Sequence, residues 1–116
     1  MRIFILFASL LFSLNAAAQK SGIITQTITV NGNCEECKKR IENAADIKGV
    51  KICNWNPDTK VATITYNSDA ISLEKIEQAI ARAGYDAGNI KGDDKAYSKL
   101  PTCCKYRNGK CEEKGK

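Results

Sequence analysis

The 116-residue sequence contains no histidine, and this absence removes several classes of site at once. Zinc sites that depend on imidazole ligands are excluded, as are catalytic dyads in which histidine is the base. The chain has a formal net charge of +5, but its basic residues do not form a stripe interleaved with aromatic residues. We interpret this mild excess as an aid to solubility and expect no nucleic-acid partner.

Long hydrophobic runs are also scarce, and the one that is present lies at the N-terminus. Met1-Arg2 supplies a charged start, Ile3–Leu14 is apolar, and Ala16-Ala17-Ala18 resembles a small-residue cleavage signal. This pattern predicts a secretory signal peptide over residues 1–18, cut after Ala18. The apolar run is short for a membrane span, so we expect none after cleavage. The mature chain would lose Arg2, carry a net charge of +4 and be exported, as a periplasmic or secreted protein.

Cysteine, in contrast, is plentiful, and all six residues would survive cleavage. Disulfide bonds are the usual use of cysteine in an exported protein. The distribution here argues for something else, because two cysteines form a close pair and three are crowded near the C-terminus. The six residues are Cys34, Cys37, Cys53, Cys103, Cys104 and Cys111.

The close pair, Cys34-Glu35-Glu36-Cys37, lies where a strand pattern changes to a helix pattern. Sulfur atoms at this spacing can converge on one metal ion or on each other. The first turn of a helix has free N–H groups and a positive dipole end, which favour the thiolate form. The helical periodicity places Cys37 on the buried face, and Cys34 should be more exposed. Two thiolates without histidine favour a soft, low-coordinate ion such as Cu(I) or Hg(II), whereas Zn(II) would need further ligands.

Hydrophobic periodicity and turn residues predict six elements in the order β-α-β-β-α-β. This order indicates an α+β, ferredoxin-like sandwich, with a four-stranded antiparallel sheet and two helices on one face. Ser72 is expected to cap the second helix, and Gly84 to end it. Residues 19–91 would form this domain, and residues 92–116 a basic tail that contains cysteine. The expected strands are Ile23–Val30, Val50–Trp55, Val61–Tyr66 and Tyr85–Ile90, and the expected helices are Glu35–Ala45 and Leu73–Ala83.

The segment Ile23–Ile90 resembles the heavy-metal-associated domain family. The likeness rests on the strand, Gly32, the cysteine pair, the helix, the hairpin, the second helix and Ala83-Gly84-Tyr85. The family includes copper chaperones, domains of copper-pumping ATPases and the periplasmic mercury-binding protein. The resemblance implies that Cys34 and Cys37 bind the metal ion and that Tyr85 is the aromatic residue near the site. The family's usual methionine is missing, because Gly32-Asn33 directly precedes Cys34.

We therefore expect a metal-binding protein, not an enzyme, that passes Cu(I) or another soft ion to a partner by ligand exchange. The partner would be a membrane metal transporter or another metal-binding protein. The accessory ligand candidates are Tyr85, Glu36, Cys103, Cys104 and Cys111.

Three alternatives stay open at the level of sequence. Cys34 and Cys37 could form a local disulfide, and the tail cysteines could form one with Cys111 instead of binding metal. The same cysteine pair could serve a thiol-disulfide oxidoreductase, although the proline expected beside such a site is missing: Pro57 lies in a hairpin turn and Pro101 in the tail. The third alternative is a module that serves only as a structural or interaction unit.

Overall fold

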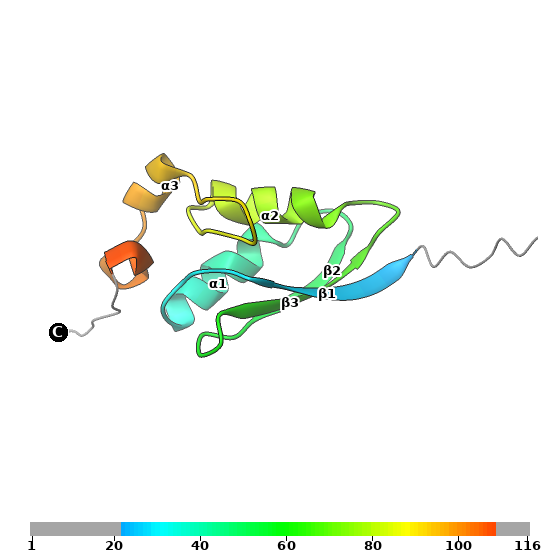
Figure 1. Ribbon diagram of the computed structural model, residues 1–116, viewed down its shortest axis with the longest axis horizontal. Coiled ribbons are helices and arrows are strands. Elements are labelled where there is room, and N and C mark those ends of the chain that lie inside the picture. The colour runs from blue at the N-terminus through cyan, green and yellow to red at the C-terminus, as the bar shows by residue number, and fades with distance from the viewer. Residues whose placement is uncertain (1–21, 109–116) are drawn as a thin grey trace, which may run out of the picture.

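The computed structural model describes residues 22–108, which form a three-stranded sheet with helices packed on it (Figure 1). The predicted signal peptide and Cys111 lie outside the described residues. The strand order is β1-β3-β2, and both pairings are antiparallel. The elements are β1 (Ile23–Thr29), α1 (Glu35–Ala44), β2 (Val50–Trp55), β3 (Val61–Asn67), α2 (Leu73–Arg82) and α3 (Asp94–Ser98), followed by the short 3-10 helices η2 (Thr102–Cys104) and η3 (Tyr106–Asn108).

The hydrophobic core lies between α1, α2 and one face of the sheet. Alternate residues of the central strand β3, namely Ala62, Ile64 and Tyr66, are buried, as the period of a half-buried strand requires. From the helices, Ile41 and Ile76 are buried against this face. Burial of these apolar side chains is the main stabilising contribution, at about 25 cal/mol for each square ångström removed from water.

The helix termini follow the predicted local signals. Ser72 caps α2, since its hydroxyl oxygen accepts a 3.2 Å hydrogen bond from the N–H of Lys75. Gly84 follows α2 with a φ of +104°, a conformation that other residues adopt only with strain. Both sequence expectations for this helix are confirmed.

The predicted fourth strand, Tyr85–Ile90, differs from what forms. In the part of the chain that the structure describes, this segment makes only the isolated bridges Val30↔Ala87 and Ala87↔Ile90. It lies at the β1 edge, where a fourth strand would pair, but Ala87 and Ile90 exchange backbone hydrogen bonds with each other. Gly88, at φ +58°, turns the chain back before a longer ladder can form. The expected four-stranded sheet is therefore three strands and a single-residue pairing.

Residues 92–108, which the sequence analysis assigned to a basic tail, contain short helices. α3 begins at the Asp93 cap, whose carboxylate accepts a 2.8 Å bond from the Ala96 N–H, and Leu100 and Cys104 are buried in the main core. η2 contacts α1, so this segment returns to the end of the domain that carries the cysteine pair (Figure 1). We call residues 101–107 the C-terminal clasp. The predicted domain boundary near residue 91 stays a prediction.

Candidate metal centre

The cysteine pair lies at the start of α1, as predicted. Cys34 is the residue that precedes the helix and is partly exposed, whereas Cys37 in the first turn is fully buried. The backbone N–H of Asn33 donates a 3.3 Å hydrogen bond to Cys37 Sγ, and such a bond stabilises a thiolate. The expected difference in exposure between the two cysteines is confirmed.

Trp55 forms the floor of the loop that precedes the pair. Its indole N–H donates a 2.9 Å hydrogen bond to the carbonyl oxygen of Val30, and the side chain is fully buried. A Cβ on Gly32 would lie 3.1 Å from the Trp55 ring and 3.2 Å from Cys37 Cβ. Glycine at position 32 thus lets the loop pass close to both side chains, which is how the sequence places the thiols against the core.

A third cysteine reaches the same point from the C-terminal clasp. The Sγ atoms of Cys34, Cys37 and Cys104 all lie within 4.8 Å of one another. Cys104 is fully buried, and Cys37 and Cys104 carry free thiols, so neither belongs to a disulfide in this structure. The local Cys34–Cys37 disulfide, one of the alternatives, is therefore not what the structure contains.

Cys103 contributes its backbone to the same region. Its carbonyl oxygen accepts a 3.2 Å hydrogen bond from Asn33 Nδ2 and a 3.6 Å bond from the Cys34 thiol. These contacts join the clasp to the loop of the cysteine pair. The Sγ of Cys103 does not belong to the three-sulfur group.

The Tyr85 side chain is fully buried beside the thiols. Its hydroxyl has no hydrogen-bond partner among the described residues, which is costly for a polar group removed from water. Burial raises the pKa of Tyr85 above its ordinary value, and the nearby thiols of Cys104 and Cys37 raise it further. Tyr85 therefore stays a neutral O–H donor, available to a sulfur that becomes negatively charged.

The electrostatic setting keeps the clasp thiols protonated in the absence of a cation. Burial raises the pKa of Cys104, and the nearby Cys37 raises it further. Burial and then the charge of Cys34 raise the pKa of Cys103 in the same direction. A soft cation would have to displace these protons, because metal ligation requires the thiolate.

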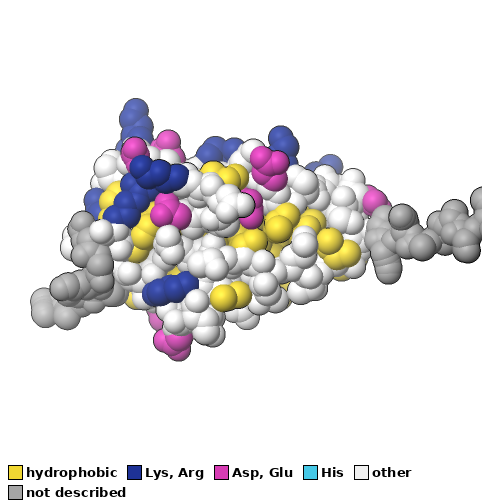
Figure 2. All heavy atoms as spheres, viewed as in Figure 1, with side chains coloured by type: hydrophobic (Ala, Val, Ile, Leu, Met, Phe, Trp, Pro, Cys, Tyr) yellow, Lys and Arg dark blue, Asp and Glu magenta, His cyan; other side chains and the backbone are white. Residues whose placement is uncertain are grey.

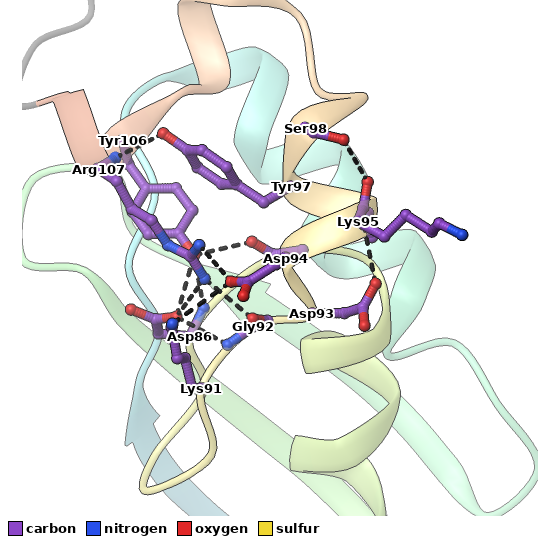
Figure 3. Close-up of polar contacts among 12 residues, drawn as sticks. Asp86, Lys91, Gly92, Asp93, Asp94, Lys95, Tyr97, Ser98, Tyr106 and Arg107 are labelled. Carbon is purple, nitrogen blue, oxygen red and sulfur yellow. Dashed lines mark hydrogen bonds and ion pairs between the residues drawn. The ribbon is translucent and has the colours of Figure 1, made fainter.

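The clasp is held on the domain by a polar network around Asp86 (Figure 3). The Tyr106 hydroxyl donates a 2.7 Å hydrogen bond to the Gly84 carbonyl and accepts a 3.0 Å bond from the Asp86 N–H. Arg107 lies between two carboxylates, 3.3 Å from Asp86 and 2.9 Å from Asp94. Figure 2 shows basic and acidic side chains close together over the α3 end of the molecule. The network connects the clasp to the segment that follows α2.

Aromatic contacts add to this attachment. The Tyr106 ring stacks on Tyr85 with a centroid distance of 5.7 Å and meets the edge of Tyr97 at 5.1 Å. The Arg107 guanidinium lies 4.3 Å from the Tyr97 ring centroid, within the range of a cation–π contact. Tyr85 thus contacts the clasp on one side and the thiols on the other.

The remaining candidates from the sequence fall into different places. Glu36 forms a 3.4 Å ion pair with Arg40 and is not part of the three-sulfur group. Cys53 is partly buried on β2 and packs against the core. Sequence reasoning missed Asn33, Tyr106 and Arg107. The aromatic and basic residues of the tail were a signal that could have pointed to Tyr106 and Arg107. Nothing in the sequence, however, shows that these two side chains contact Asp86.

Together, the βαββα arrangement and the thiol pair at the start of its first helix define a class of small metal-binding domains. Residues 25–86 match the heavy-metal-associated domain family, and the chain belongs to it. This confirms the resemblance seen in the sequence.

Individual relatives carry names that refer to copper and mercury proteins. A copper chaperone, CopZ, from Staphylococcus epidermidis is 34% identical over 61 residues, which cover 51% of this chain and 90% of the relative. The structure is similar to that of oxidised MerP from Ralstonia metallidurans, with a TM-score of 0.54, 28% identity and coverage of 57% and 94%. It is also similar to the Cu(I)-loaded N-terminal domain of a potential copper-translocating P-type ATPase from Bacillus subtilis, with a TM-score of 0.53, 25% identity and coverage of 60% and 90%.

These matches cover only part of the chain. The family match ends at Asp86, so η2, η3 and the third thiol lie beyond it. Among the described residues, no helix is long and apolar enough to cross a membrane.

Proposed function

We propose that this protein binds Cu(I), or a similarly soft ion, through Cys34 and Cys37 and passes it to a partner by ligand exchange. The observation that carries the proposal is the placement of the two thiols at the N-terminus of α1. The Asn33 N–H and the positive end of the helix dipole both favour thiolate at this point. Copper chaperones among its relatives support the choice of ion.

The difference in exposure between the two cysteines suits ligand exchange. Cys37 is held in the core, while Cys34 is partly exposed at the surface. An incoming thiolate of the partner would bond to the ion as the Cys34 sulfur leaves, and a second ligand of the partner would then replace Cys37. Each released thiolate would take up a proton from solvent. The partner would be a metal transporter or a second metal-binding protein. The activity is binding and transfer, without chemical turnover.

Titration with Cu(I) in competition with a chromogenic chelator tests the binding. The reduced wild-type protein should take up one ion tightly, and Cys34→Ser or Cys37→Ser should weaken binding by at least a hundredfold. Cys53→Ser is the matched control, since this cysteine lies on β2 outside the three-sulfur group. Unchanged affinity in the Cys34→Ser/Cys37→Ser double variant would rule out the proposal. Catalytic reduction of a disulfide substrate at rates above those of small thiols would favour the oxidoreductase alternative instead.

We also propose that the protein is exported after removal of residues 1–18, on the strength of the charged start, the apolar run and the alanine triplet. Mass spectrometry of the protein from a periplasmic extract of the host should give a chain that begins at Gln19. A chain that retains Met1 and remains with the cytosolic fraction would contradict export.

A further inference from the structure

We propose that the C-terminal clasp supplies a third metal ligand, so that Cys34, Cys37 and Cys104 hold the soft ion as a three-thiolate site. The inference rests on the proposed function and deepens it, because it changes the coordination of the ion and the way in which it leaves. Cys104 lies outside the region matched by the family. The third ligand is therefore a feature of this chain's own C-terminal extension.

The geometry of the three sulfur atoms fits such a site. With metal–sulfur bonds of about 2.3 Å, an ion at the centre of an equilateral triangle of thiolates needs sulfur–sulfur distances of about 4.0 Å. All three Sγ atoms already lie within 4.8 Å of one another. The ligands could therefore close on an ion through small side-chain rotations, without movement of α1 or the clasp.

Several independent contacts fix the position of Cys104. Its own N–H donates a 2.8 Å bond to the Pro101 carbonyl, which forms η2. On one side of η2, the Cys103 carbonyl is bonded to Asn33. On the other side, Tyr106 and Arg107 bind the segment around Asp86. Cys104 is thus directed at Cys37 by contacts that do not involve its own sulfur.

The buried hydroxyl of Tyr85 provides a second observation that points to a ligand here. This group is buried beside the thiols and has no partner among the described residues. Three thiolates on one soft ion carry a net negative charge, and a buried O–H donor would stabilise that charge by a hydrogen bond to sulfur. The orphaned donor is therefore explained if the three-sulfur group becomes an anionic complex.

Binding at this site would proceed with a balanced exchange of protons. As each sulfur–metal bond forms, that thiol releases its proton to solvent, so three protons leave when one ion is bound from three protonated thiols. For the ion to pass to a partner, all three of these bonds must break, each replaced by a bond to a ligand of the partner, and each released thiolate takes up a proton from solvent. Cys34 can be replaced at the surface, but the fully buried Cys104 can leave only when the clasp moves. The clasp would thus slow the release of the ion.

The test measures affinity and sulfur coordination in the reduced protein loaded with one equivalent of Cu(I). X-ray absorption should report three sulfur ligands in the wild type and two in Cys104→Ser, and chelator competition should show affinity at least tenfold lower in the variant. Cys53→Ser is the control, because this cysteine lies on β2 and its sulfur is outside the three-sulfur group. The control should retain three sulfur ligands and an affinity within threefold of the wild type.

Two sulfur ligands in the wild type, with unchanged affinity in Cys104→Ser, would overturn the inference and leave the Cys34–Cys37 function intact. If Cys34→Ser and Cys37→Ser also bind normally, the proposed function itself fails. These two failures are therefore distinguishable.

If Cys104→Ser does not fold, Arg107→Ala decides the question, because it keeps every cysteine and removes the ion pairs with Asp86 and Asp94. Release of Cu(I) to a chelator should be at least threefold faster than in the wild type. Arg82→Ala on the exposed end of α2 is the control and should release the ion at the wild-type rate. Equal release rates in all three proteins would overturn the inference.

Discussion

The Tyr106 hydroxyl donates a 2.7 Å hydrogen bond to the carbonyl oxygen of Gly84, the residue that follows the C-cap of α2. The same hydroxyl accepts a bond from the Asp86 N–H, so one side chain satisfies a donor and an acceptor on either side of Tyr85. Tyr85 in turn lies against the thiols. This relationship joins the end of the family domain, the clasp and the candidate metal centre.

We expect Gly84→Ala to lower the free energy of unfolding by about 2 to 4 kcal/mol. Alanine is strained at a positive φ, and its added Cβ would be packed too tightly against its neighbours. The residue has a φ of +104°, and a Cβ would lie 2.9 Å from the Tyr97 backbone nitrogen. Gly22→Ala is a matched control, with a φ of +107° and, among the residues that the structure describes, nothing within 4 Å of the new Cβ. Urea denaturation should show a clearly larger loss at position 84. Equal losses of stability in the two variants would mean that the close approach of α3 to Gly84 adds nothing to the cost of the substitution.

A second prediction concerns Glu42, which joins α1 to the end of β2. Its carboxylate accepts a 2.6 Å bond from Lys38 Nζ and a 2.8 Å bond from the Trp55 N–H. Glu42→Gln should lower the free energy of unfolding by about 1 to 2 kcal/mol, because a charged acceptor is replaced by a neutral one. Glu36→Gln is the control: its ion pair with Arg40 is largely exposed, and the loss should be at most about 0.5 kcal/mol. Thermal or chemical denaturation monitored by circular dichroism measures both, and a similar loss in the two variants would contradict the assigned role of Glu42.

The Glu36 control has a second use at the metal centre. Since Glu36 is not part of the three-sulfur group, Glu36→Gln should bind Cu(I) with wild-type affinity. A loss of more than tenfold in chelator competition would return Glu36 to the list of ligands.

The attachment of the clasp should depend on pH through Asp86. Burial opposes ionisation of this carboxyl, but bonds from the Gly92 N–H, Asn31, Tyr106 and Arg107 outweigh it and hold its pKa below the ordinary value of 3.8. A lowered pKa in the folded state means that the stabilisation is present above the ordinary value and is lost as the pH falls through the folded pKa. The wild type should exceed Asp86→Asn by about 1 to 2 kcal/mol at pH 7, with the difference shrinking below pH 3.8.

Denaturant unfolding of both proteins between pH 7 and pH 2.5 measures this difference. Asp46→Asn, at an exposed position after α1, is the control for loss of a surface carboxylate and should change the free energy of unfolding at pH 7 by at most about 0.5 kcal/mol. A gap between wild type and Asp86→Asn that persists unchanged at pH 2.5 would show that charge on Asp86 is not the cause.

A fourth prediction separates Cys53 from the other thiols. Burial, followed by the nearby charge of Glu42, raises the pKa of Cys53 from 9.0 to about 11. Because only the thiolate reacts, alkylation of Cys53 at pH 8 should be about a hundredfold slower in the folded protein than in urea. Peptide mapping after timed alkylation measures the two rates. Equal rates would mean that β2 opens faster than the reagent reacts.

Much of the domain was predictable because its signals are local. Alternating residues in β1 and β3, the Ser72 cap and Gly84 each specify structure within a few positions of themselves, and the structure follows them. The cysteine pair was placed correctly for the same reason, since a strand-to-helix junction can be read from its periodicity. The fourth strand was predicted too long because the turn at Gly88 depends on backbone bonds between Ala87 and Ile90 that short patterns do not reveal.

The sequence by itself determined the family, the two helices, the hairpin and the pair of thiols at the start of α1. It also singled out Cys103 and Cys104, but could not say whether they bind each other, Cys111 or the distant pair. Only the tertiary structure decided that Cys104 is the tail cysteine that completes the three-sulfur group with Cys34 and Cys37. The physical reason is that this choice depends on the Asn33, Tyr106 and Arg107 contacts, which join segments far apart in the chain and have no periodicity of their own.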